Sequence, residues 1–247
     1  MTNAAKPRHA ATVILLRRAV PTGFEVFLTQ RAENMPFLGG MYCFPGGGVG
    51  KEDFSARMIE RCSGLGRDQA RKNIGAQLRP SEALGFWVAA IRELFEEVGI
   101  LLAVNSSGAR VAMSAPQRKR LAEKHAALIG KTLNFGALLE SEDLRGDLAA
   151  LAYFSHWQTP AQNAIRFDTR FFLADLPNDQ MPLASSYEVA HSLWLTPDRA
   201  IQLFEHGELP LIFPTFASLR TLADFNTLES LFEEFGGPRG LASAIQA

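Results

Sequence analysis

Three glutamates stand close together in a short stretch of the chain: Glu93, Glu96 and Glu97. If this stretch is an α-helix, their carboxylates lie on one face within about 6 Å of helix length. Carboxylates so placed repel one another unless water, arginine or a cation lies between them. Hard divalent cations such as Mg²⁺ or Mn²⁺ prefer clustered oxygen ligands of this kind. The spacing therefore predicts a metal site, and the alternative is an ordinary solvated helix face.

The residues around the glutamates predict the helix that must position them. At about 100° per residue, the apolar side chains gather on the arc opposite the carboxylates, with Arg92 at the edge of the acidic arc. Gly99 follows directly and is typical of a helix end. The predicted buried positions are Trp87, Val88, Ile91, Leu94, Phe95 and Val98.

The segment from Arg92 to Ile100 reads R-E-L-F-E-E-V-G-I and resembles the core of the Nudix box. That family hydrolyses compounds in which a nucleoside diphosphate is linked to another group. The resemblance implies that Glu93, Glu96 and Glu97 bind Mg²⁺ or Mn²⁺, with Glu96 and Glu97 as the strongest ligands. Arg92 would pair with a glutamate and hold its rotamer, and an ordinary surface ion pair is the alternative.

A glycine-rich segment precedes this helix. Phe24 to Arg31 and Met41 to Phe44 are predicted strands, and the second runs into Pro45-Gly46-Gly47-Gly48. Glycine lets the backbone approach a ligand closely, so amides and carbonyls of Gly46 and Gly47 could contact substrate. A simple turn is the alternative. In the Nudix family a glycine carbonyl of this loop commonly helps to bind the metal, which implies Gly47.

The spacing between the two motifs is longer than in the usual Nudix pattern, G-x5-E-x7-R-E. Leu84 occupies the position eight residues before Arg92 where that pattern has a glutamate. Residues 49–80 are therefore predicted to be an insertion of short helices, after which Ser81 would cap the long helix. A second helical insertion is predicted at about 115–145.

The remaining elements predict an α/β (α+β) fold in one domain spanning residues 1–247. With the resemblance, this implies a Nudix-type α/β/α sandwich with a mixed sheet and helical insertions. Further strands are expected at Ala10–Arg18, Ile100–Val104, Leu151–Thr159, Ile165–Ala174 and Tyr187–Leu195; helices are expected at Pro116–Ile129 (with Leu121, Ala126 and Leu128 inward), Asn134–Leu144, 197–206, Phe213–Phe225 and Leu228–Phe235.

Arginines and one outlying acid complete the candidate site. Arg31, Arg166 and Arg170 could bind substrate phosphates through their forked donors. An internal ion pair with Asp168 is the alternative to this role. Asp168 is two residues from both Arg166 and Arg170, so in a strand its side chain would lie on the same face as theirs. Glu188 stands where many Nudix enzymes place an additional acid as ligand or base, and a solvent-facing strand residue is the alternative.

Composition limits the partners. The chain has 247 residues, 47% of them hydrophobic, and a net charge of −1. These values predict one sizeable core and disfavour nucleic acid as an electrostatic partner. No apolar run reaches membrane-spanning length and no signal-peptide core opens the chain, so a cytoplasmic location is expected, with a homodimer possible.

Two further segments narrow the resemblance. Tyr153–Pro160 and Arg166–Ala174, with the interrupted box, resemble the Nudix branch that includes peroxisomal coenzyme A (CoA) diphosphatases. This implies a metal-dependent diphosphatase acting on CoA or acyl-CoA. The alternatives are ADP-ribose, NADH or another nucleotide conjugate as substrate, a non-catalytic nucleotide-sensing Nudix protein, and an interaction protein with an acidic helix.

Overall fold

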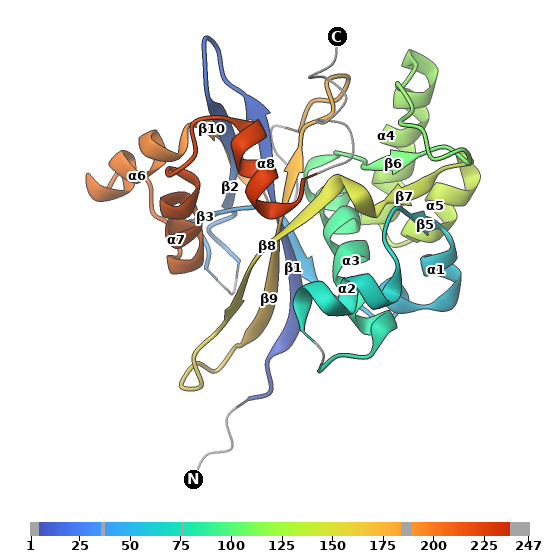
Figure 1. Ribbon diagram of the computed structural model, residues 1–247, viewed down its shortest axis with the longest axis horizontal. Helices are drawn as coiled ribbons and strands as arrows, with labels where there is room; N and C mark the ends of the chain where they lie inside the picture. The colour runs from blue at the N-terminus through green and yellow to red at the C-terminus, as the bar shows by residue number, and fades with distance from the viewer. Residues whose placement is uncertain (1–4, 36–37, 76, 184–188, 238–247) are drawn as a thin grey trace.

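The computed structural model describes residues 5–35, 38–75, 77–183 and 189–237. Its centre is a mixed sheet in which the long strands lie in the order β10-β2-β1-β9-β8 (Figure 1). β1 and β9 run parallel, and the other pairs are antiparallel. Two short strands pair with inner strands of this sheet, β3 with β2 and β4 with β1. The strands are β1 (Arg8–Arg18), β2 (Phe24–Arg31), β3 (Tyr42–Cys43), β4 (Gly46–Gly48), β8 (Leu151–Gln158), β9 (Phe167–Asp175) and β10 (Val189–Leu195).

Helix α3 (Pro80–Val98) covers one face of this sheet. All six apolar positions predicted for its inner face are buried, and Trp87 packs on Phe172 of β9 with ring centroids 4.8 Å apart. The helix ends at Gly99, whose φ of 73° is left-handed. Its N-cap is Arg79 and not the predicted Ser81, because Pro80, which has no N–H to leave unsatisfied, takes the first helical position.

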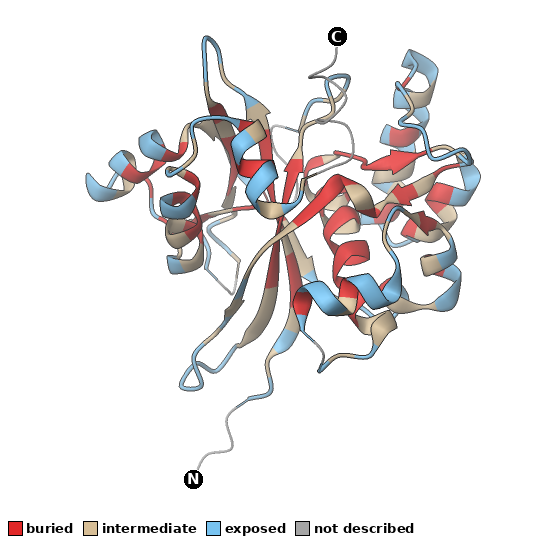
Figure 2. Cartoon of the chain, in the orientation of Figure 1, coloured by how far each residue is buried: buried red, intermediate tan, exposed pale blue. Residues whose placement is uncertain are grey.

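Three helices cover the other face of the sheet: α6 (Pro197–Glu205), α7 (Phe213–Leu222) and α8 (Leu228–Phe235). Alternation along β1 divides the core, because Val13 and Leu15 face α3 whereas Ile14 and Leu16 face this second layer. Figure 2 shows the buried residues concentrated along the central strands and α3. The predicted α/β/α sandwich with a mixed sheet is confirmed.

Helices occupy both predicted insertions. Residues 49–80 contain a 3₁₀ turn (Glu52–Phe54), α1 (Ala56–Glu60) and α2 (Arg67–Ile74). Residues 115–145 contain α4 (Ala115–Ile129) and α5 (Phe135–Ser141). Both insertions lie on the α3 side of the molecule (Figure 1).

A second, smaller sheet lies between the two insertions, in the order β5-β7-β6. It consists of β5 (Cys62–Ser63), β6 (Ala103–Val104) and β7 (Arg145–Asp147), and a second 3₁₀ turn (Leu148–Ala150) leads into β8. The sheet packs tightly on α3: a Cβ on Gly146 would lie 2.5 Å from Cδ1 of Ile91. Both insertions are thereby attached to the helix that carries the glutamates.

Two details differ from the sequence prediction. The strand expected at Ile100–Val104 is reduced to Ala103–Val104. In α4, Leu121 and Leu128 are buried as predicted, whereas Ala126 is exposed. Two residues rotate a helix by about 200°, so Ala126 cannot share the stripe of Leu128. Within the described residues, no helix is both long and apolar enough to span a membrane.

Candidate active site

The glycine strand β4 lies directly against the acidic face of α3. The backbone N–H of Gly46 donates a hydrogen bond to Oε2 of Glu97 at 3.0 Å. Gly47 touches Glu93 so closely that an added Cβ would lie 2.5 Å from the carboxylate carbon. Only glycine fits at this position without displacing the acid. The structure therefore brings together the two motifs that the sequence singled out.

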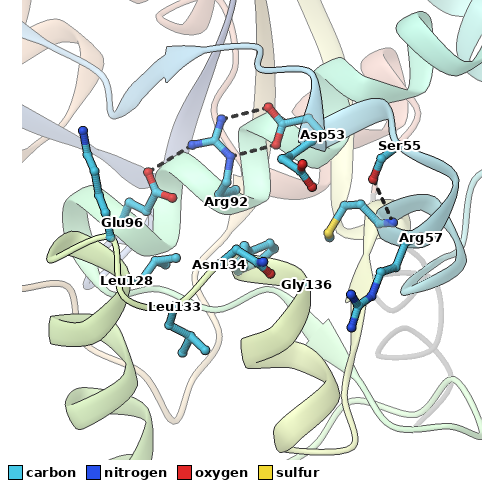
Figure 3. A pocket seen from close by; sticks show the side chains of 13 residues that line it. Asp53, Ser55, Arg57, Arg92, Glu96, Leu128, Leu133, Asn134 and Gly136 are labelled. Atoms are coloured by element: carbon cyan, nitrogen blue, oxygen red, sulfur yellow. Dashed lines mark hydrogen bonds and ion pairs between the residues drawn. The ribbon is translucent and has the colours of Figure 1, made fainter.

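Arg92 joins the acidic face to the segment that follows the glycines. Its Nη1 contacts Oε1 of Glu93 at 2.8 Å and Oε2 of Glu96 at 3.0 Å. Its Nε and Nη2 hold both oxygens of Asp53 at 2.7 and 2.9 Å, and Nη2 also donates to the Gly48 carbonyl at 2.8 Å. Figure 3 shows the contacts of Arg92 with Asp53 and Glu96. Arg92 therefore pairs with glutamates as expected. Its guanidinium is largely buried, so these contacts differ from an exposed surface ion pair.

Asp53 is a site residue that the sequence analysis missed. It is only 2% exposed, and its Oδ2 also accepts the Gly50 N–H at 2.7 Å. Counted forward from Gly47, the pattern G-x5-E places its first acid at position 53, where a shorter aspartate stands. Counted backward from Arg92, the same pattern places this acid at position 84, where Leu84 of α3 is buried in the hydrophobic core. The extra residues therefore follow Asp53, which belongs with the glycine loop.

Burial shapes the electrostatics of the acidic cluster, which consists of Asp53, Glu93, Glu96 and Glu97 around Arg92. Burial raises the pKa of Glu93 to about 7; the negative charges of Glu96 and Asp53 add to the rise, and Arg92 opposes it. Burial also works against the charge of Arg92, but its hydrogen bond to Asp53 and the neighbouring carboxylates hold its pKa above the usual value. One guanidinium thus faces three carboxylates, an excess of negative charge that a divalent cation could balance.

The carboxylates share one helix face but point in different directions. Glu93 and Glu96 are turned to Arg92, whereas Glu97 is turned to the amide of Gly46. Among the described residues, no three acidic, histidine or cysteine side chains converge closely enough to hold an ion. The oxygen donors suit Mg²⁺ or Mn²⁺ in number and kind, but Glu93 and Glu96 must turn away from Arg92 to bind it together with Glu97.

Arg31 lies beside the acidic cluster. Partial burial raises the pKa of the Cys43 thiol to about 11; the charge of Glu97 adds to the rise, and Arg31 opposes it. Because both charges act on the same thiol, Arg31 at the end of β2 and Glu97 both lie near Cys43. Glu188 lies outside the described residues; Val189, which follows it, pairs with Arg31 across β10 and β2.

Arg170 lies apart from this cluster, in an internal ion pair. It is 6% exposed, contacts Asp168, and places its guanidinium 5.3 Å from the ring centre of Phe86. In the sheet register it is separated from Gly47 by Ala11 of β1. For Arg170, the internal ion pair with Asp168, which was the alternative to phosphate binding, is therefore present.

Arg166 is placed differently from expectation. It directly precedes β9, which begins at Phe167, and so lies outside the strand that carries Arg170. Its guanidinium donates to the carbonyls of Thr159 at 3.1 Å and Ala5 at 2.7 Å, which lie just beyond the ends of β8 and β1. These contacts hold the chain ends of β1, β8 and β9 together.

Comparison with known proteins agrees with this geometry. A family model described as the NUDT19 Nudix domain matches residues 7–222. The acyl-coenzyme A diphosphatase NUDT19 of Gallus gallus is 30% identical over 285 residues, covering 95% of this chain and 72% of that protein. The Homo sapiens protein of the same name is 29% identical over 241 residues, covering 85% and 63%.

A solved structure has the same fold. The crystal structure of a NUDIX hydrolase from Alicyclobacillus acidocaldarius superposes with a TM-score of 0.72 at 27% identity, covering 93% of this chain and 96% of that one. The family match spans both the glycine strand and the acidic helix, and the intervening segment supplies Asp53 to the same cluster. The chain therefore belongs to the Nudix hydrolase family, in the group defined by the NUDT19 Nudix domain.

Proposed function

We propose that this protein hydrolyses the diphosphate of CoA or acyl-CoA in a reaction that requires Mg²⁺ or Mn²⁺. The observation that carries the proposal is the acidic face of α3 held against the Gly46–Gly48 strand by Arg92. The substrate class rests on the relatives named acyl-coenzyme A diphosphatase. A Nudix hydrolase of ADP-ribose, NADH or another nucleotide conjugate is the alternative within the same chemistry.

The reaction adds one water across the diphosphate. The water oxygen forms a bond to one phosphorus, the bridging P–O bond breaks, and the bridging oxygen leaves on the other phosphate. With CoA the products are adenosine 3′,5′-bisphosphate and 4′-phosphopantetheine, and the proton released from the water passes to a base or to solvent. The bound ion supplies charge neutralisation of the phosphates and a lowered pKa of the attacking water.

The chain supplies the ligands and their placement. We assign Glu93, Glu96 and Glu97 as ligands, with the carbonyl of Gly47 beside them. The hydrogen bond from Gly46 orients Glu97, and the contacts from Arg92 orient the other two glutamates.

The remaining roles follow from position. Arg31 borders the cluster and is our first candidate for binding a substrate phosphate, with the Gly46 and Gly47 backbone beside it. Arg166 and Arg170 remain predicted phosphate ligands that would have to leave their present contacts. Glu188 remains the predicted additional acid, as ligand or general base.

The wider assignment is also a proposal: one Nudix domain with two helical insertions, located in the cytoplasm, without nucleic acid or membrane partners, and able to form a homodimer. Size-exclusion chromatography with light scattering tests the dimer. Cell fractionation tests the location.

A substrate panel tests the activity. The protein is incubated with CoA, acyl-CoA, ADP-ribose and NADH, each with Mg²⁺, with Mn²⁺ and with EDTA, and products are separated by chromatography. Adenosine 3′,5′-bisphosphate released from CoA or acyl-CoA only with metal is the expected result. AMP from ADP-ribose or NADH alone would favour the alternative substrates. No product from any compound would contradict the enzymatic assignment and favour a nucleotide-sensing protein.

A further inference from the structure

A cavity of about 340 Å³ adjoins the acidic cluster, between α3 and the two insertions. Arg92 and Glu96 form one wall of it (Figure 3). The first insertion contributes Met58, and the loop from α4 to α5 contributes Leu133. Since Asp53, Arg92 and Glu96 belong to both the cavity and the cluster, a substrate held at the cluster can extend into the cavity.

The charges that line the cavity are balanced. The acidic residues are Glu52, Asp53 and Glu96, and the basic residues are Arg57, Arg92 and Lys131. A part of a ligand that carries several negative charges would need an excess of cations, as phosphate-binding sites have. The equal numbers of acidic and basic side chains instead suit an uncharged part of a ligand.

The remaining lining combines apolar side chains with amide and hydroxyl groups. Leu128 and Leu133 supply apolar surface. The Asn134 Oδ1 accepts the Ala137 N–H at 2.8 Å, so the donors of that side-chain amide stay available. Ser55 Oγ accepts the Met58 N–H at 3.2 Å and can still donate its own hydrogen. Such a lining suits a chain in which methylene groups alternate with amides.

A nucleotide base fits this cavity poorly. Among the described residues that line it, the one aromatic side chain is Phe135. Phe135 is 3% exposed and packs on Phe95 with ring centroids 6.3 Å apart. Its ring faces are therefore not available for stacking on a base, which is how aromatic residues usually hold one.

We propose that this cavity receives the pantetheine arm of the substrate, which is uncharged, carries two amides, and is attached to the diphosphate. The inference rests on the proposed function, since it takes the diphosphate to be held at Glu93, Glu96 and Glu97. It assigns the two insertions a role in distinguishing the two halves of CoA.

Gly136 offers a way to fill the cavity without removing a contact. It lines the cavity within α5, and an added Cβ would lie 3.4 Å from Met58 Sδ and 3.6 Å from Asn134 Oδ1, which are ordinary contact distances. Gly136→Ala should therefore be accommodated and serves as the matched control. Gly136→Leu should project into the cavity, and it also replaces a glycine inside a helix by a better helix former.

The experiment compares inhibition by the two products. In Gly136→Leu, the inhibition constant of 4′-phosphopantetheine and the KM for CoA should rise about tenfold, as for a pocket that has lost room for a ligand group. The inhibition constant of adenosine 3′,5′-bisphosphate should stay within about twofold, and the effects of Gly136→Ala should be smaller than those of Gly136→Leu. The melting temperature of each variant verifies folding.

The outcomes separate this inference from the proposed function. Wild-type protein that does not hydrolyse CoA or acyl-CoA would contradict the proposed function, and this inference with it. Wild-type turnover with unchanged 4′-phosphopantetheine inhibition in Gly136→Leu would contradict this inference alone. A selective loss of adenosine 3′,5′-bisphosphate binding would place the nucleotide half in the cavity instead.

If Gly136→Leu does not fold, Leu133→Ser is the second variant. It removes part of the half-buried apolar wall, and 4′-phosphopantetheine inhibition should weaken while adenosine 3′,5′-bisphosphate inhibition is retained. Equal effects on both products would contradict the proposal.

Discussion

Asp53 and Arg92 form a bidentate ion pair between the 3₁₀ turn Glu52–Phe54 and helix α3. Nε and Nη2 of Arg92 meet the two oxygens of Asp53 at 2.7 and 2.9 Å. Asp53 is nearly fully buried, so the pair is shielded from solvent. It joins the 3₁₀ turn after the glycine strand to the acidic face of α3, and thus positions the two halves of the site relative to each other.

Asp53→Asn should therefore destabilise the protein and lower its activity. It removes the charge that balances Arg92 and disrupts the paired hydrogen bonds, and we expect a loss of about 1–3 kcal/mol in the free energy of unfolding. Urea denaturation measures this value, and the CoA assay measures turnover. Glu52→Gln, at the exposed neighbouring position, is the control and should leave stability near wild type. A fully stable, fully active Asp53→Asn protein would show that the pair is dispensable.

Glu97→Gln should remove metal-dependent turnover while the fold persists. The side-chain oxygen of glutamine can still accept the Gly46 N–H, and loss of one charge from a like-charged helix face relieves repulsion. We expect turnover to fall by at least about 100-fold with a change in stability within about 0.5 kcal/mol. Glu205→Gln, at an exposed position of α6, is the control. Wild-type turnover in Glu97→Gln would exclude Glu97 from the reaction.

Leu94→Ala tests the packing of α3. Leu94 is fully buried between the helix and the sheet, so its truncation should leave a cavity and lower the free energy of unfolding by about 2–5 kcal/mol. Thermal or urea unfolding provides the measurement. Val20→Ala, at a position 96% exposed, should change stability by less than about 0.5 kcal/mol. Equal stabilities of the two variants would contradict the packing described for the helix.

Glu142 should make stability depend on pH in acid. Hydrogen bonds and charge from Arg120 and Lys124 outweigh burial and lower the pKa of Glu142 to about 2, below its ordinary value of about 4.5. A carboxylate with a lowered pKa in the folded state stabilises the protein above about pH 4.5 and loses that contribution as pH falls toward 2. Unfolding free energies measured from pH 6 to pH 3 should therefore decline.

Glu142→Gln provides the comparison for this decline. The variant should be less stable by about 1–3 kcal/mol at pH 6 and should approach wild type at low pH. Parallel pH profiles for the two proteins would show that the ion pairs of α4 with Glu142 contribute nothing to stability.

Periodicity was sufficient to predict much of the fold. The strand Phe24–Arg31 and the helix Leu228–Phe235 have the bounds that their patterns predicted. α3 was predicted with its buried face because a long helix repeats its apolar stripe many times. The strands of the smaller sheet were missed or misplaced because two or three residues are too few to show an alternating pattern.

The site was predicted less completely, for two physical reasons. Asp53 stands at the position of the first acid only when the motif is counted forward from Gly47, and its contact with Arg92 across the inserted segment forms only in the tertiary fold. Helical spacing also fixes the face on which Glu93 and Glu96 stand but not the direction of their flexible side chains, which Arg92 attracts. For Arg170, strand alternation could not decide between Asp168 and a substrate phosphate.

The smaller sheet also couples the two insertions structurally. β5 comes from the first of them and bonds to β7, which begins at the last residue of the second. A deletion in either would leave unpaired backbone groups in the other, so their lengths are expected to change in concert among relatives. Grafting substrate preference from one relative to another would accordingly require exchanging both segments as a unit.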